Sequence, residues 1–374
     1  MAQDRARERA RTTVRTVGVE EEFLLVDPGS GRAVAVAATA LRRAPGSGGA
    51  DGTELTGELA AEQLETGTAP CRGLDDLAAE IRARRAEARG AARAAGAEAV
   101  PLATSPVPVD PHISPDDRYR RMIERFGRTG SEQLTCACHV HVAVESEDEA
   151  VGALDRIRPW LAPLLALSVN SPFWAGGDTG YGSFRTQVWG RWPSAGPTEV
   201  FGSAAAHREV VATLLGPDTL LDQGMIYFDA RVSHHHPTLE VRVADVCREP
   251  DDAVLVAALT RALVETAARA WAAGEPADPV RSEVLRLASW RAARSGLDGP
   301  LLDPRTWRPA PADEVVRALL EHVEEALGDA GERETVGELW TGLWHRRPGA
   351  THQRAAFEKG GDTRAVVLDA LENL

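Results

Sequence analysis

Three consecutive acidic residues precede an apolar run near the start of the chain, in Gly18–Asp27 (GVEEEFLLVD). The apolar part, Phe23–Val26, is followed by a Pro-Gly turn signal, so the segment predicts a buried β-strand. Side chains alternate across a strand, and Glu20 and Glu22 therefore share one face, roughly 7 Å apart. Two carboxylates this close to a core repel each other, and a divalent cation with oxygen ligands, Mg²⁺ or Mn²⁺, would resolve the conflict. An edge strand whose acids face solvent explains this one segment equally well.

Cysteine and histidine alternate in a second segment, Thr135–Val142 (TCACHVHV). On a strand, His139 and His141 share one face, while Cys136 and Cys138 share the opposite face. The four side chains cannot converge on one ion, so we expect the cysteines in the core and the histidines on a polar face. A His-x-His pair is also typical of metal-dependent hydrolases, which makes that class the main alternative, although such enzymes need further ligands from later strands.

Charged side chains share a face in a third alternating segment, Thr238–Val246 (TLEVRVADV). Glu240 and Arg242 lie on one face of this predicted strand, and Gln63–Thr66 predicts a short strand with Glu65 on its polar face. Each segment alone fits a surface strand, but four strands together present acids, histidines and an arginine opposite their apolar side chains. If these polar faces meet, they form an acidic floor suited to holding divalent ions against a polyphosphate.

A stretch rich in glycine and aromatic residues, Asn170–Trp192 (NSPFWAGGDTGYGSFRTQVWGRW), fits neither helical nor strand periodicity. Its glycines let the backbone approach a ligand, and Arg185 and Arg191 lie among its aromatic residues. An irregular loop of this length is more often functional than not. A rigid Ω-loop with its rings packed inward is the alternative.

Helices and further strands must position these groups. Helical periodicity predicts helices at Leu74–Ala97, Glu147–Ser168, Ala253–Ala272 and around Asp313–Leu327. We expect Pro159 and Pro163 to kink the second helix and Asp251 to cap the third. Alternation predicts strands at Val100–Ser105 and Gln133–Glu145. This order indicates an α+β fold: an antiparallel sheet with helices packed on its apolar side and an open polar face.

The composition is that of a chain that can bury a large core. Its 374 residues are 43% hydrophobic and carry a formal net charge of −14, which argues against nucleic-acid and anionic membrane partners. The polar, arginine-rich residues 1–14 predict a frayed tail, followed by one domain over residues 15–374. Four cysteines and the lack of a signal-peptide pattern favour a cytoplasmic protein. Apolar helix faces left over after the sheet is covered are compatible with a homo-oligomer.

Lysine is almost absent: Lys359 is the only one. A phosphate-binding loop of the form GxxxxGK[ST] is therefore missing, and a Schiff-base lysine is not favoured. If the protein handles phosphate, metal ions and arginines must bind it.

Five segments, in order between Val17 and Cys247, together resemble a known family. GVEEEFLLVD, LETGTAP, CHVHVAV, NSPFWAGGDTGYGSFRTQVW and TLEVRVADVC resemble the bacterial carboxylate-amine ligases related to glutamate–cysteine ligase (type 2, YbdK-like). Weaker echoes follow at Trp290–Gly299 and at Gln353 and Arg354. Each motif alone is modest in specificity, whereas the ordered set is strong. The resemblance implies a glutamine-synthetase-like catalytic sheet and ATP-dependent amide-bond formation, with Mg²⁺ bridging acids and phosphates.

The resemblance also implies roles for residues of this chain. The residues at the metal ions would be Glu20, Glu22, Glu58, Glu65, Glu240 and His139. The catalytic residues would be Arg185, Glu240 and Arg242, with the arginines facing the transferred phosphate or the substrate carboxylate. ATP would contact His139 and His141. Arg294 and Arg354 on the C-terminal helices are candidates for binding its adenine, and a solvated helix face is the alternative for both.

In the implied reaction, the substrate carboxylate attacks the γ-phosphate of ATP to give an acyl phosphate and ADP. An amine then attacks the acyl carbon, and phosphate leaves. Metal ions and arginines stabilise charge in both steps, so no cysteine is required as a nucleophile. Glutamate and cysteine are the expected pair, giving γ-glutamylcysteine. The alternatives are a hydrolase that uses His139 and His141, and an idle member that binds a nucleotide or an amino acid as a sensor.

Overall fold

An antiparallel sheet with β1 at its centre organises the chain. The computed structural model describes residues 14–43, 55–216 and 219–374. The seven strands of the sheet run in the order β2–β3–β1–β5–β9–β8, and β4 also pairs with β1. They are β1 (Val17–Val26), β2 (Thr56–Gly57), β3 (Gln63–Gly67), β4 (Glu98–Val100), β5 (Ala137–Ala143), β8 (Ala230–Val232) and β9 (Thr238–Asp245).

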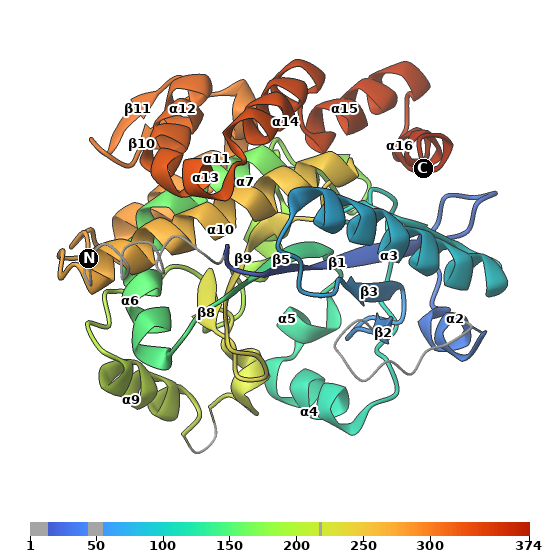
Figure 1. Ribbon diagram of the computed structural model, residues 1–374. Helices are drawn as coiled ribbons and strands as arrows, with labels where there is room; N and C mark the ends of the chain where they lie inside the picture. Colours follow the sequence, from blue (N-terminus) through green and yellow to red (C-terminus); the bar gives the residue numbers. More distant parts are fainter. Residues whose placement is uncertain (1–13, 44–54, 217–218) are drawn as a thin grey trace.

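Four helices cover the apolar face of this sheet (Figure 1). They are α3 (Leu74–Ala94), α6 (Glu147–Ile157), α7 (Leu161–Ser168) and α10 (Pro250–Ala272). Most side chains that the three central strands bury in this core are at most 2% exposed, among them Val17, Val19, Cys138, Val140, Val142, Leu239 and Val241. Burying an aliphatic side chain of this size stabilises a fold by about 1.5–3 kcal/mol. The alternation therefore fixes which face of each strand turns toward the helices, and the predicted α+β fold is confirmed.

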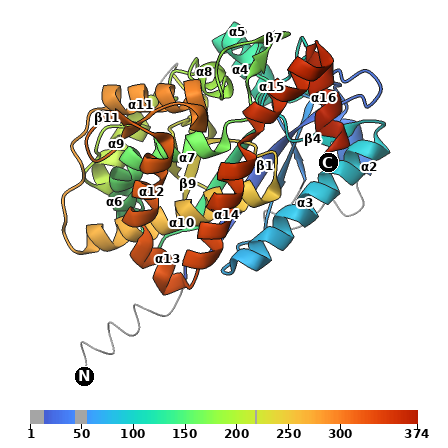
Figure 2. The same ribbon diagram turned by 90° about the horizontal axis from the view of Figure 1, so that it is seen from above.

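The C-terminal part of the chain forms an outer helical layer over α7 and α10 (Figure 2). It contains α11 (Ser282–Ser295), α12 (Ala312–His322), α13 (Glu324–Ala330), α14 (Arg333–Arg346) and the hairpin β10 (Leu301–Asp303) to β11 (Arg308–Ala310). Beside β4 and α3 lie α2 (Ala37–Arg43), α15 (Gly349–Gly360) and α16 (Thr363–Glu372). Among the described residues, none of the helices combines the length and the apolar composition needed to cross a membrane.

Shorter elements flank the opposite, polar face of the sheet, where α4 and α5 lie across from α3 and α10 (Figure 1). They are α4 (Asp117–Phe126), α5 (Arg128–Ser131), β6 (Phe173–Trp174), β7 (Gly177–Asp178), α8 (Arg185–Trp189), α9 (Ala204–Leu214) and the 3₁₀ turn η2 (Gln223–Met225). Met122, Trp192, Met225 and Tyr227 form a small core of their own here. The polar face of the sheet is thus walled by elements with independent packing.

Two local expectations are wrong. The strand expected at Val100–Ser105 is β4, which ends at Val100 because the following Pro101 has no N–H to donate to the sheet. The helix expected to be capped by Asp251 begins at Pro250 with Glu249 at its N-cap. Asp251 lies instead in the first turn, where its charge interacts favourably with the helix dipole.

Proline acts as predicted in the long helix expected at Glu147–Ser168. A 3₁₀ turn at Arg158–Trp160, centred on Pro159, separates α6 from α7. The stretch Asn170–Trp192 is less irregular than expected, because it contains β6, β7 and α8.

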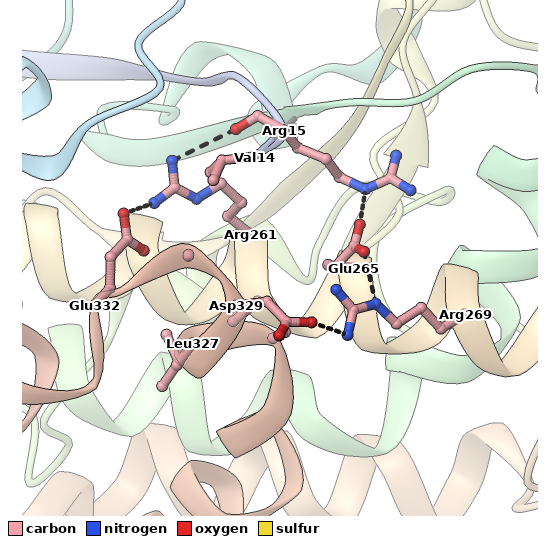
Figure 3. Close-up of a pocket in the computed structure, with 11 residues that line it drawn as sticks. Val14, Arg15, Arg261, Glu265, Arg269, Leu327, Asp329 and Glu332 are labelled. Atoms are coloured by element: carbon pink, nitrogen blue, oxygen red, sulfur yellow. Dashed lines mark hydrogen bonds and ion pairs between the residues drawn. The ribbon is translucent and has the colours of Figure 1, made fainter. Parts of the chain in front are cut away.

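Ion pairs fix the segment before β1 to the helices that cover the apolar face of the sheet (Figure 3). Arg15 Nη2 lies 2.5 Å from Glu149 Oε1, and Arg15 Nε lies 2.6 Å from Glu265 Oε2. Glu265 continues the chain of contacts to Arg269, whose Nη1 lies 2.8 Å from Asp329 of α13. Residues 1–13 of the expected tail lie outside the described residues, and the single-domain boundary stays a prediction.

Candidate active site

Strand register brings the polar side chains of neighbouring strands together. Glu22 of β1 lies opposite Glu65 of β3, and Glu20 of β1 lies opposite His139 of β5. Directly opposed residues of an antiparallel pair have Cβ atoms about 4.5–5.5 Å apart. The acids and the histidine therefore form one continuous polar surface.

A cavity of about 240 Å³ opens over this surface. Its acidic half, at β1, β3 and the residue that follows β2, is lined by Glu20, Glu22, Glu58 and Glu65. Its cationic half, at β8, β9 and the flanking elements, is lined by Arg118, Arg185, Arg231 and Arg242. Aromatic side chains close the wall: Tyr119, Trp189, Trp192 and Tyr227. The cavity is thus divided by charge.

Three carboxylates of the acidic half form no ion pair with any residue that the structure describes. They are Glu22, Glu58 and Glu65; the backbone N–H of Ala137 donates to Glu22 Oε2 at 2.8 Å. Burial, reinforced by the charge of Glu58, raises the pKa of Glu22 to about 8. Burial also raises the pKa of Glu58, and raises that of Glu65 together with the neighbouring acids. Such a cluster binds protons unless a cation replaces them.

Glu20 differs from these acids because two histidines face it. His139 Nδ1 lies 3.5 Å from Glu20 Oε2, and His141 Nε2 lies 3.2 Å from Oε1. Burial pushes the pKa of Glu20 up, but the histidine contacts outweigh it and hold that pKa well below its usual range. His141 is itself oriented by Thr238, whose Oγ1 lies 3.0 Å from its Nδ1.

His139 has the properties of a metal ligand. It is 4% exposed, and burial, followed by the positive charge of Arg242, lowers its pKa to about 3. The imidazole is therefore neutral near pH 7, which is the form that binds metal ions. Its buried Nε2 has no hydrogen-bond partner in the described part of the chain.

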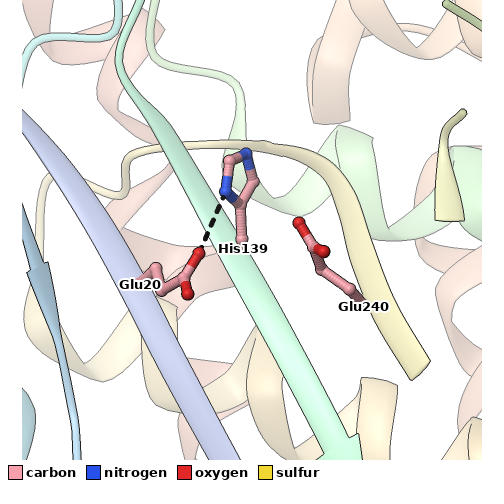
Figure 4. A group of neighbouring side chains, drawn as sticks. All are labelled: Glu20, His139 and Glu240. Carbon is pink, nitrogen blue, oxygen red and sulfur yellow. Dashed lines mark ion pairs between the residues drawn. The ribbon is translucent and has the colours of Figure 1, made fainter. Parts of the chain in front are cut away.

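Two groups of side chains present ligand atoms that lie within 4.8 Å of one another. One consists of Glu20, His139 and Glu240, which point toward one another from β1, β5 and β9 (Figure 4). The other consists of Glu22, Glu65 and His139. Carboxylate oxygens with one imidazole form a donor set that fits Mg²⁺ or Mn²⁺.

Arginines already engage both oxygens of Glu240. Arg231 Nε donates to Glu240 Oε2 at 2.7 Å and its Nη2 donates to Oε1 at 3.2 Å, while Arg242 Nη1 also donates to Oε1. Against the effect of burial, the two guanidinium groups hold the pKa of Glu240 well below its usual range. Glu240 therefore fixes two arginines, and it is less available to a metal ion than Glu22 or Glu65.

A β-bulge in β9 occurs at Arg242. Between two paired positions of β5 and β9, Arg242 and Val243 both lie opposite His139 alone. The backbone N–H of Arg242 donates to Asp229 O at 2.9 Å. A bulge bends its strand and re-aims the side chains around it, and the Arg242 guanidinium carbon lies 5.5 Å from the ring centroid of Trp189.

Arg185 lies against the carbonyl groups of this bulge. Its Nη1 donates to Val243 O at 3.3 Å and its Nη2 donates to Arg242 O at 3.1 Å. Arg185 is 2% exposed, so burial lowers its pKa, and Asp245 at 3.8 Å opposes this shift. An arginine remains charged in such surroundings. The two buried guanidinium groups thus form a fixed cationic surface beside Trp189.

Asp245 ties the loop Asn170–Trp192 to β9. Its Oδ2 accepts from Asn170 N at 2.8 Å and from Ser171 Oγ at 2.7 Å, and its Oδ1 accepts from Ser183 Oγ at 2.8 Å. Asp245 is 0% exposed, and hydrogen bonds to a buried carboxylate are among the strong ones. The loop and α8 are therefore held rigidly against the catalytic face.

Comparison with models of protein families shows which family the chain belongs to. The model of glutamate–cysteine ligase family 2 matches residues 16–368. The chain belongs to this family. A Streptomyces avermitilis relative, provisionally named glutamate–cysteine ligase 2-1, is 51% identical over 358 residues, covering 96% of this chain and 99% of the relative. A Frankia alni relative, provisionally named glutamate–cysteine ligase 2-2, is 51% identical over 365 residues, or 95% of each chain.

Two solved structures share the fold of this glutamate–cysteine ligase family 2 protein. The bifunctional glutathione synthetase of Pasteurella multocida matches with a TM-score of 0.70 at 16% identity, over 96% of this chain and 52% of that longer one. The glutamate–cysteine ligase of Francisella tularensis, solved in complex with AMP, matches with a TM-score of 0.65 at 12% identity, over 96% of this chain and 88% of that one. At these identities the matches show the fold.

The two arginines that were expected to bind the adenine of ATP do not line the charged cavity. Arg294 donates to Gly180 O, and Arg354 forms two 2.8 Å hydrogen bonds with Asp178. Both therefore brace the loop that carries β7, and their contact with ATP stays a prediction. His141 also lies outside the cavity lining and contacts Glu20 instead.

Among the described residues, His139 and His141 do not share a candidate metal group, as a hydrolase that uses both would require. Each of the two candidate metal groups contains a single histidine, His139. His207, His234 and His236 line a separate cavity beside α9 and β8. Cys138 lies at 0% exposure on the apolar side of the sheet, so the expectation that the cysteines belong to the core is confirmed for this position.

Three residues of the site were missed at the level of sequence. Arg231 stands on a three-residue strand, too short to show alternation. Arg118 forms a bidentate pair with Asp222 at 2.6 and 2.9 Å, and its only sequence signal is the density of charge in α4. In the sequence, Asp245 is only the last polar residue of an apolar strand. Its role in holding the loop Asn170–Trp192 is visible only from its hydroxyl and amide partners, which are distant in sequence.

Proposed function

We propose that this protein is an ATP-dependent carboxylate–amine ligase that joins glutamate to cysteine, giving γ-glutamylcysteine, ADP and phosphate. The observation that carries the proposal is one cavity divided into an acidic and a cationic half, in a member of glutamate–cysteine ligase family 2. Acids suit metal ions, and arginine forks suit phosphate and carboxylate groups. The names of the relatives supply the substrate pair.

The acidic half would hold Mg²⁺, or Mn²⁺ in its place. The first ligands would be the carboxylates of Glu22 and Glu65, which have no ion-pair partner among the described residues, and Nε2 of His139, which has no hydrogen-bond partner among them, with Glu20 and Glu58 beside them. When bound, such ions screen the charge of the ATP phosphates and polarise the transferred phosphoryl group. The unpaired acids are the feature of this chain that fits them.

The cationic half would bind the anionic groups that react. Arg185 is fixed by two backbone carbonyls and Arg242 by the carboxylate of Glu240, with Trp189 against both. Because these donors are fixed before the substrates bind, little reorganisation is needed as charge develops in the transition state. Arg118 and Arg231 line the same half of the cavity, where Arg118 is paired with Asp222 and Arg231 with Glu240.

The reaction then proceeds in two displacements. An oxygen of the glutamate side-chain carboxylate attacks the γ-phosphorus, the bond to the ADP oxygen breaks, and an acyl phosphate forms. The cysteine nitrogen, as the free amine, attacks the acyl carbon; phosphate leaves with the original carboxylate oxygen, and the amine gives up one proton to the departing phosphate or to water. Arg185 and Arg242 stabilise the phosphoryl oxygens in both steps. No protein nucleophile is needed, and all four cysteines are buried.

ADP formation tests this proposal. Purified protein is incubated with Mg²⁺, ATP and glutamate across a panel of amines that includes cysteine, and the products are identified by mass spectrometry. We expect ADP release that requires both glutamate and cysteine. Release with another acid or amine would overturn the substrate pair, and ATP binding without turnover across the panel would overturn the ligase assignment in favour of a sensor.

Two matched variants distinguish an effect on the metal site from a general effect on the fold. Glu22→Gln removes an unpaired acid of the cavity, while Glu124→Gln removes an exposed acid of α4. We expect the first to abolish metal-dependent ADP formation and the second to leave it near the wild-type rate. Near-normal activity of Glu22→Gln would contradict the metal assignment.

A further inference from the structure

A second cavity lies behind the sheet, on the face opposite the active site. It measures about 270 Å³ and is bounded by α3, α16 and the segment that follows β4. Phe23 of β1 lines it together with Leu102 and Val366. Phe23 points away from the catalytic acids because it stands at an odd position of the strand. We call this space the back cavity; it is slightly smaller than the ~300–1,000 Å³ pockets of drug-sized ligands.

The back cavity has an arginine without a partner among the described residues. Four arginines line it: Arg82, Arg85, Arg89 and Arg248. Three of them form ion pairs with acidic side chains. Arg89 alone of the four forms no hydrogen bond or ion pair with any residue that the structure describes, and its Nε is buried. A half-buried guanidinium group favours an anion that supplies the missing contacts.

A second polar group of the same wall is unsatisfied. Gln353 is 4% exposed, and its Nε2 donates to the backbone oxygen and to Oδ1 of Asn170, both at 2.8 Å. Its Oε1 has no hydrogen-bond partner among the described residues. Buried side-chain acceptors are normally paired. The wall of the back cavity therefore has two polar groups with unmet hydrogen bonds among the described residues, Arg89 and Gln353.

We propose that the back cavity binds a small amphiphilic anion, with its carboxylate on Arg89 and its apolar body against the partly exposed Pro101, Ala370 and Leu374. The apolar lining excludes a free inorganic ion as the preferred occupant, because such an ion leaves this surface uncovered. The unpaired guanidinium excludes a neutral hydrocarbon, because it leaves the charge without a partner.

An occupant of the back cavity would contact an arginine that supports the active site. Arg85 donates to the Glu21 carboxylate at 2.8 and 2.6 Å, and Glu21 lies between Glu20 and Glu22, the two acids of β1 that line the active-site cavity. Arg85 also donates to Arg248 O at 2.9 Å and to Cys247 O at 2.7 Å, just beyond β9. Since Arg85 joins β1 to the end of β9, the proposal includes a shift in Mg²⁺ binding when the back cavity is filled.

Octanoate is the probe for the site, because it combines a carboxylate with an apolar chain. Isothermal titration of the full-length protein should show saturable binding of octanoate, and weaker binding of acetate and 1-octanol, which each lack one of the two features. Arg89→Leu should weaken octanoate binding by about 10- to 100-fold, the range of a charge-assisted contact, and Arg89→Lys should restore part of it. Arg93→Gln, on the same helix but outside the cavity, should bind like the wild type.

Three outcomes would overturn the ligand site: no saturable binding, equal binding by Arg89→Leu, or 1-octanol binding as tightly as octanoate. The linkage is tested by the Mg²⁺ concentration that gives half-maximal thermal stabilisation. Octanoate should change this Mg²⁺ concentration in the wild type and not in Arg89→Leu. If octanoate leaves it unchanged in the wild type, the proposed coupling between the back cavity and Mg²⁺ binding is overturned. If Mg²⁺ fails to stabilise the protein at all, the metal proposal for the active site fails, and the direct binding result remains separate.

Discussion

Replacing Glu22 by glutamine should stabilise the metal-free protein and abolish its response to metal ions. Glu22 lies among acids that have no cationic partner in the described structure, and its pKa is raised to about 8, first by burial and then by Glu58. Ordinary destabilising substitutions lower stability whether or not a ligand is present. A substitution that raises stability and removes ligand binding is the signature of a strained binding site.

The magnitude follows from the pKa values. With an ordinary pKa of 4.5 and a folded-state pKa of about 8, the folded protein keeps a proton on Glu22 that the unfolded chain releases. Stability is therefore unaffected by Glu22 below pH 4.5 and falls as the pH rises from 4.5 to 8. At about 1.4 kcal/mol per pH unit, the cost at pH 7 is about 3 kcal/mol. Glu22→Gln should recover up to this amount at pH 7 and almost nothing near pH 4.5.

Thermal unfolding in EDTA, at pH 5 and pH 7.5, measures the effect. Glu22→Gln should raise the unfolding midpoint by a few degrees more at pH 7.5 than at pH 5, and Mg²⁺ should stabilise the wild type but not the variant. Glu124→Gln is the control and should show neither change. A Glu22→Gln protein that is less stable than the wild type at both pH values, or that gains as much stability from Mg²⁺, would refute the reasoning.

Other predictions concern the loop, the arginines and the metal ions. Asp245→Asn should lower the free energy of unfolding by about 2 kcal/mol, because it weakens three buried hydrogen bonds, and urea unfolding that matches the wild type would contradict this. Arg185→Lys keeps the charge but loses the paired donors, so kcat should fall by about 10- to 100-fold with saturating ATP; an unchanged kcat would remove Arg185 from the mechanism. EDTA should abolish ADP formation, and Mg²⁺ or Mn²⁺ should restore it, with Glu65→Gln requiring more Mg²⁺ than the wild type; activity that persists in EDTA would contradict the metal site.

Alternation along single strands made the polar face predictable. Glu20 and Glu22 had to lie on one face and Phe23 on the other, because a strand places neighbours on opposite sides and burial decides which side is apolar. The same argument separated His139 from Cys138. These inferences need only local geometry, and the structure agrees with them.

Pairing between distant segments was not predictable in this way. The bulge at Arg242 depends on the register of two strands, and the strand β8 that carries Arg231 is too short to show a period. Asp245 acts through hydroxyl and amide groups more than 60 residues away. Arg354 carries the same charge as Arg185, and only tertiary structure shows that it pairs with an acid on the loop instead of facing the cavity.

The central claim is that the substrate carboxylate is activated by phosphoryl transfer, and an oxygen label tests it directly. Glutamate carrying ¹⁸O in its side-chain carboxylate is incubated with ATP, Mg²⁺, cysteine and the protein, and the inorganic phosphate is analysed by mass spectrometry. An acyl phosphate transfers one labelled oxygen to phosphate for every amide bond formed. Amide and ADP formed with unlabelled phosphate would contradict the mechanism.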